Sequence, residues 1–139
     1  MVSFGDGAFD ALQTITGSLD LSGNTSMTTI DAGAFEALET VGDATNGGNL
    51  YISGNTSLAT ATITGCFPAL KDVYGGLLLT GNTAPGFTTI AATEFPLLET
   101  VGGNSTSGGS LDLGNNDNLT TIADAFPLLK TVEIDLHHH

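Results

Sequence analysis

Few side chains in this sequence could carry out catalysis. The chain has no arginine, its only lysines are Lys71 and Lys130, and its three histidines are the last three residues. Residues 137–139 are interpreted as the remnant of a purification tag and are set aside. Because the usual general bases and oxyanion-stabilising groups are missing from residues 1–136, we expect a protein that is not an enzyme.

Cysteine and carboxylate chemistry is also weakly supported. Cys66 has no histidine near it in the sequence, so it is predicted to be a small packed residue rather than a nucleophile. Asp20 and Asp112 share one position of a repeated L-x-L segment, three repeats apart, which corresponds to roughly 14 Å at strand spacing. Glycoside hydrolysis needs two carboxyl groups about 5 to 9.5 Å apart. No catalytic residue is predicted.

Three oxygen-rich segments raise the question of a metal site. The segments "FGDGAFD", "VGDATNGGN" and "GNNDNL" combine glycine with Asp or Asn, and a hard cation such as calcium prefers oxygen ligands. None of them has the spacing of an EF-hand loop, and the same composition is ordinary in turns. We therefore predict turns, no metal site and no cofactor, with calcium binding by a loop as the alternative.

The composition restricts the partners. The chain has 139 residues, of which 40% are hydrophobic and 12% charged, and its formal net charge is -13. A surface so poor in Lys and Arg disfavours nucleic acid and anionic membranes, because both require cations to meet phosphate. No uncharged apolar run is long enough to cross a bilayer, so membrane insertion is not expected.

One phrase recurs along the chain. The segment "LDLSGNTSMTTI" of residues 19–30 returns with variations at residues 50–60, 77–90 and 111–122. Its asparagine recurs at steps of 31, 27 and 34 residues, as Asn24, Asn55, Asn82 and Asn116. Loops of variable length between intact core phrases are what a stacked solenoid tolerates.

Two kinds of segment alternate within each repeat. Phenylalanine, leucine and valine follow one another at intervals of three, and a proline after the phenylalanine in three repeats opposes a long helix. The L-x-L segment has the alternation of a strand with inward leucines. The sequence therefore predicts a mainly β solenoid of parallel strands, with about four to five rungs (turns of the coil) and little or no α-helix. Residues 1–136 are interpreted as a single solenoid that is a fragment of a longer array or starts mid-repeat within one.

Residues at equivalent positions of successive rungs form columns. One column has the members Gln13, Glu39, Lys71, Glu99 and Lys130, so opposite charges are predicted to stack as a surface ladder. The repeated asparagines are predicted to supply stacked amides that satisfy the backbone of a buried turn.

The repeated phrases resemble a known class of solenoid. "GAFEALETV", "FPALKDVYGGLLLTGN" and "FPLLETVGGN" followed by "GGSLDLGNNDNLTTI" are similar to leucine-rich repeats of the receptor L-domain and BspA-like microbial cell-surface types. The resemblance implies a right-handed coil of parallel strands, an extracellular or cell-surface location and a non-enzymatic role in recognition or structure. Any secretion signal would lie outside this sequence. The chain departs from the family in having no capping cysteines and in starting and stopping within a rung.

The outward residues of the L-x-L strands are the first candidate for a binding site. Solenoids commonly bind through such a surface. Its central positions are Asp20, Tyr51, Leu78 and Asp112, with Tyr51 and Leu78 predicted to form a small contact patch. The favoured hypothesis is a recognition or adhesion module that binds a protein or a glycan here.

Columns of threonine support an alternative function. A regular array of threonines on a solenoid is typical of ice-binding proteins, and the candidate residues are Thr28, Thr29, Thr60, Thr88, Thr89, Thr120 and Thr121. The default interpretation is that these threonines favour stacking of strands. Neighbouring residues of a strand point in opposite directions, so "TTI" is expected to make a poor two-column face. A further alternative is a structural unit that associates end to end through uncapped rungs.

Overall fold

The structure, a computed structural model, describes residues 3–4, 11–26, 29–30, 34–58, 65, 67–90, 94–102, 109, 111–122, 126–132 and 136–137. For residues 3–4, 29, 121, 131–132 and 136–137, only the backbone is described. All strands in these ranges are two residues long, and the ranges contain no helix. The described part of the chain therefore has no helix that could cross a membrane.

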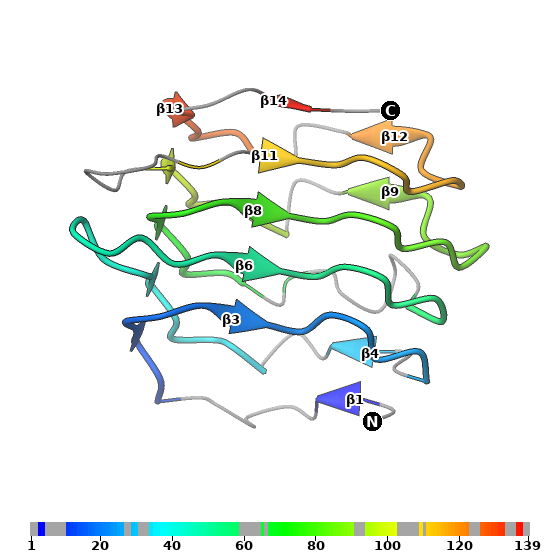
Figure 1. Cartoon of the computed structure of the whole chain (residues 1–139), viewed down its shortest axis with the longest axis horizontal. Coiled ribbons are helices and arrows are strands. Elements are labelled where there is room, and N and C mark those ends of the chain that lie inside the picture. The colour runs from blue at the N-terminus through cyan, green and yellow to red at the C-terminus, as the bar shows by residue number, and fades with distance from the viewer. Residues whose placement is uncertain are drawn as a thin grey trace.

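The strands stack in parallel on three sides of one coil, which rises from the N-terminus to the C-terminus (Figure 1). The first side consists of β2 (Thr14–Ile15), β5 (Thr40–Val41), β7 (Asp72–Val73), β10 (Thr100–Val101) and β13 (Thr131–Val132). The second side consists of β3 (Leu19–Asp20), β6 (Leu50–Tyr51), β8 (Leu77–Leu78), β11 (Leu111–Asp112) and β14 (Leu136–His137). On the third side, β1 (Ser3–Phe4) pairs with β4 (Thr29–Ile30), and β9 (Thr89–Ile90) pairs with β12 (Thr121–Ile122). The predicted mainly β solenoid of parallel strands is thus confirmed.

A tight turn follows the second side in every full rung and explains the repeated glycine. Gly23, Gly54 and Gly81 have φ angles of 69°, 64° and 66°. The fourth rung has Asn115 at the same place, with a φ of 58°. Asparagine is among the few residues other than glycine that adopt this left-handed backbone readily, so the sequence "GNN" preserves the turn.

The asparagine column lies directly after this turn and joins the rungs. The backbone N–H of each of the first three asparagines donates to the side-chain oxygen of the next one, at 3.0 Å for Asn24 to Asn55, 3.2 Å for Asn55 to Asn82 and 2.9 Å for Asn82 to Asn116. The last three of these residues are buried. In addition, Asn82 Nδ2 donates to the carbonyl of Ile52 at 2.8 Å. The predicted ladder of amides is confirmed.

The interior of the coil is mainly apolar and ordered by rung. Four phenylalanine rings, those of Phe35, Phe67, Phe95 and Phe126, stack with centroid separations of 5.2, 5.7 and 5.5 Å. The leucines and isoleucine of the L-x-L segments at residues 50–52 and 77–79 are fully buried beside them. Stacked aromatic pairs of this kind add to the free energy gained by burying their area.

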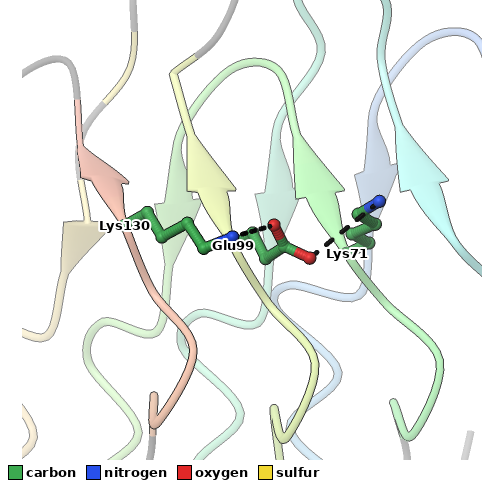
Figure 2. A network of polar contacts seen from close by, with 3 residues as sticks. All are labelled: Lys71, Glu99 and Lys130. Atoms are coloured by element: carbon green, nitrogen blue, oxygen red, sulfur yellow. Dashed lines mark hydrogen bonds and ion pairs between the residues drawn. The ribbon is translucent and has the colours of Figure 1, made fainter.

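The predicted charge column lies beside the first side. The backbone N–H of Glu39, Lys71, Glu99 and Lys130 each donates to the carbonyl of the preceding member of the column, beginning with Gln13. Figure 2 shows Glu99 between the two lysines, with Lys130 Nζ 3.0 Å from one carboxylate oxygen and Lys71 Nζ 3.9 Å from the other. The hydrogen bond from Lys130 lowers the pKa of the Glu99 carboxyl below its ordinary value, and the charges of both lysines act in the same direction. Because the lysine side chains are largely exposed, this ladder contributes little to stability.

Candidate binding face

The register of the second side brings four candidate residues into one outward row. Asp20 pairs with Tyr51, Tyr51 with Leu78, and Leu78 with Asp112. Their inward neighbours Leu50, Leu77 and Leu111 are buried, whereas Asp20 is exposed and the other three row members are half-buried. We call this row, Asp20, Tyr51, Leu78 and Asp112, the strand face.

The aromatic residue of the strand face, Tyr51, is held in place by Asn49, which precedes it by two residues in the same rung. Asn49 Nδ2 donates to the phenol oxygen of Tyr51 at 2.6 Å. The side-chain oxygen of the same asparagine accepts from the backbone N–H of Gly76 in the next rung, also at 2.6 Å. Asn49 thus ties the tyrosine hydroxyl to the backbone of two rungs. An aromatic side chain fixed before binding loses little conformational entropy when a partner arrives.

A row of hydroxyl groups runs beside the apolar centre of the strand face. Thr80 Oγ1 donates to Ser53 Oγ at 2.9 Å, and Ser53 Oγ donates to the carbonyl of Leu78 at 3.2 Å. Both side chains are half-buried. The combination places hydroxyl groups next to the Tyr51 and Leu78 side chains, so the surface offers apolar contact and hydrogen bonding together.

The two carboxylates of the strand face are oriented by their own turns. Asp20 Oδ1 accepts from the backbone N–H of Ser22 at 2.9 Å, and Asp112 Oδ1 accepts from that of Gly114 at 2.8 Å. The two strands that carry Tyr51 and Leu78 lie between them. The row is therefore apolar in its centre and negative at both of its ends, which disfavours an anionic ligand.

The threonines of the alternative site are placed only in part. Thr28 and Thr60 lie outside the described residues, and Thr29 and Thr121 are described by their backbone in β4 and β12. Thr88 and Thr120 are exposed and stack on each other, because the backbone N–H of Thr120 donates to the Thr88 carbonyl at 2.9 Å. Thr89 is half-buried and pairs with Thr121.

The two neighbouring threonines of the third side differ in exposure. Thr88 and Thr89 lie between Phe87 and Ile90, both of which are fully buried. The strand here begins at Thr89, which is half-buried, and Thr88 directly before it is exposed. The expectation that "TTI" makes a poor two-column face therefore stays a prediction.

Sequence reasoning missed one buried acid. Glu94 is fully buried immediately before Phe95, where the second rung has the small residue Ala34. The sequence does contain a signal for this residue, because the equivalent positions of the other repeats hold alanine or cysteine, which are small and usually buried. Cys66 belongs to the same column and lies outside the described residues. Within the described ranges, no three His, Cys, Asp or Glu side chains are grouped so that they could hold a metal ion.

Comparison of the chain with protein-family models, with curated proteins and with solved structures finds no match. The binding face must therefore be interpreted from its own geometry.

Proposed function

We propose that the chain is a non-enzymatic recognition or adhesion module of an extracellular or cell-surface protein, and that it binds a protein or a glycan through the strand face. The observation that carries the proposal is the pairing of Tyr51 with Leu78 in adjacent strands, with the tyrosine hydroxyl held by Asn49. Tyrosine anchors are enriched among the residues that dominate binding energy at interfaces.

The chemistry of the strand face favours a neutral or cationic partner. Hydroxyl groups of Ser53 and Thr80 beside the tyrosine suit a ligand that has both apolar patches and hydrogen-bonding groups, which sugars and peptides share. The net charge of -13 and the carboxylates at both ends of the row repel phosphate and sulfate groups. The resemblance to cell-surface leucine-rich repeats supports the same class of function.

The proposal is tested by screening the chain against an array of neutral oligosaccharides and a panel of secreted and cell-surface proteins. For the ligand found, Tyr51→Ser and Leu78→Ser are each expected to weaken binding at least about tenfold, which corresponds to 1.4 kcal/mol for a central anchor. Leu97→Ser is the matched control, because Leu97 is an exposed leucine outside the strand face. Equal binding by wild type and both strand-face variants would exclude this surface.

Ice binding is the second candidate, and the exposed column of Thr88 and Thr120 favours it. These two threonines stack on adjacent rungs, with the half-buried Thr89 next to Thr88, and form the start of a regular array with no described charge in these columns. Thr88→Tyr should abolish thermal hysteresis and ice-crystal faceting, whereas Thr14→Tyr on the first side should leave both intact. Round ice crystals from the wild-type protein at high concentration would rule this function out.

A further inference from the structure

Both lysines of the chain lie in one surface column, and the chain has no arginine. We call the column from the second rung to the fifth, in which the sign of the charge alternates, the charge column; its members are Glu39, Lys71, Glu99 and Lys130 (Figure 2 shows the last three). The lysine side chains are 56% and 72% exposed, and Glu39 is exposed as well. This column is therefore the one surface on which lysines can offset the repulsion between two copies of a chain whose net charge is -13.

A second outward column runs beside the charge column, two residues earlier in each rung. We call it the apolar column, and its members from the second rung to the fifth are Ala37, Ala69, Leu97 and Leu128. Leu97 and Leu128 are 45% and 44% exposed, and they are two of the three exposed large hydrophobic residues in the described ranges. Leu97 does not owe its exposure to an end of the chain, because its rung pairs with a rung on each side through β10. The apolar column thus has two small residues followed by two large, exposed ones.

Both columns are complementary to themselves when their order is reversed. In reverse order, each negative charge takes the place of a positive one, and each large residue takes the place of a small one. A two-fold axis that is perpendicular to the coil and lies midway between the third and fourth rungs places each column against its own reversed copy. We propose that two copies of this chain pair side by side and antiparallel through the charge column and the apolar column, about this axis.

The charge column then forms ion pairs in both directions across the contact. The axis brings the second rung of one copy opposite the fifth of the other, and the third opposite the fourth. Glu39 faces the partner's Lys130, and Lys71 faces the partner's Glu99. Each contact occurs twice because the interface is symmetric, so all four charges of both copies meet an opposite charge. Electrostatic complementarity of this kind fixes the register of the two copies and excludes other registers.

The apolar column fits the same axis. Leu128 lies opposite the partner's Ala37, and Leu97 lies opposite the partner's Ala69. Because a large side chain always meets a small one, the two faces can approach closely enough for the flanking charges to pair. The two leucines of each copy lose their exposed surface to the contact, and the removal of this apolar area from water favours association.

Other arrangements of the same face set like charges against each other. In a parallel pair, or with an axis that passes through a rung, Lys71 would face the partner's Lys71 or another residue of equal sign. In the antiparallel pair, even the acid of the adjoining column is accommodated, because Asp72 faces the partner's Thr100. A two-fold contact uses the same surface on both copies, so association closes at two copies.

The proposed contact leaves the strand face uncovered, because it uses the first side of the coil and the turn before it. A dimer therefore presents two strand faces and would bind a ligand with repeated sites more tightly than a monomer does. Leu97→Ser changes this contact and not the strand face, so its use as the control for ligand binding requires protein concentrations at which the wild type is monomeric.

The test is size-exclusion chromatography with light scattering, from micromolar to millimolar protein, because a contact of only four rungs is small. The wild-type mass should rise from 14.1 kDa to twice that value and no further. Lys71→Glu and Glu99→Lys each put two pairs of like charges into the dimer. Each should raise the dissociation constant at least about a hundredfold, tenfold for each of the two contacts. Lys71→Arg and Glu99→Asp keep the charges and are the matched controls.

Mixing the two charge-reversed variants provides the decisive measurement. Lys71→Glu carries carboxylates at both positions and Glu99→Lys carries ammonium groups at both, so their equimolar mixture should form a heterodimer although each variant alone is monomeric. Circular dichroism and thermal melting verify that both variants are folded. A wild type that stays monomeric at millimolar concentration would overturn the proposal. So would a mixture that stays monomeric while the wild type dimerises, or a wild-type mass that grows beyond two copies.

Discussion

Replacing Asn82 by alanine tests whether the asparagine column holds the rungs together. Asn82 lies in the interior of the column and is fully buried. Its side chain accepts the backbone N–H of Asn55 at 3.2 Å and donates to the carbonyl of Ile52 at 2.8 Å. Asn82→Ala removes both hydrogen bonds, and the alanine side chain has no polar atom that could replace them.

The expected loss follows from the two backbone groups that are left behind. A buried donor or acceptor without a partner costs about 1–3 kcal/mol, so the two groups left by Asn82→Ala should lower the free energy of unfolding by roughly 2–6 kcal/mol. This is a large share of the roughly 5–15 kcal/mol that stabilises a typical domain. Asn24, at the N-terminal end of the column, is half-buried and donates to Leu21 at 3.2 Å. Asn24→Ala should cost about 0.5–1.5 kcal/mol.

Urea unfolding followed by far-ultraviolet circular dichroism measures both variants, with the slope of the transition compared to confirm that the same surface is exposed. The two substitutions remove the same atoms from the same column, so the difference between them isolates position within the ladder. A loss at Asn82 no greater than the loss at Asn24 would refute the reasoning, because the buried amide would then contribute no more than the one at the end of the column.

Two further predictions concern the turn and the charge column. Gly54→Ala should destabilise the protein by about 1–2 kcal/mol, because the φ of 64° is unfavourable for alanine, although a Cβ there would meet no atom closer than 3.9 Å. Asn115→Gly should be tolerated, because glycine adopts the same backbone conformation. Equal losses of stability for the two variants in urea unfolding would contradict this account. Lys130→Met should raise the pKa of Glu99 toward its ordinary value of 4.5, as measured by NMR titration, and Lys71→Met should raise it less, because its contact is longer. Because folding lowers the pKa of Glu99, its contribution to stability is present above pH 4.5 and is lost as the pH falls through the folded pKa. Lys130→Met should therefore make the free energy of unfolding depend less on pH in the acid range. An unchanged Glu99 pKa in this variant would contradict the ion pair.

Much of the fold could be predicted because a parallel coil places equivalent residues directly above one another. The recurrence of asparagine, phenylalanine and charged residues at matching positions is therefore enough to specify the columns. Lys71, Glu99 and Lys130 needed only a common register to become neighbours, and the structure gives them that register. The four residues of the strand face were likewise placed in one row by the L-x-L pattern.

Other features depended on contacts that no local pattern encodes. Asn49 holds Tyr51 because Gly76, far along the chain, supplies the backbone N–H that orients the asparagine. Thr88 is exposed although Ile90, two residues further on, is fully buried, which strand alternation alone does not predict.

The sequence by itself determined the repeat, the identity of each column and the absence of histidine and arginine from residues 1–136. The tertiary structure decided that the coil has three strand-bearing sides, that Asn115 takes the place of a turn glycine and that Glu94 is buried. The physical reason is that the period of the sequence sets which residues form a column. The burial of a side chain at a turn, in contrast, depends on how much space the packing of the neighbouring rungs leaves for it.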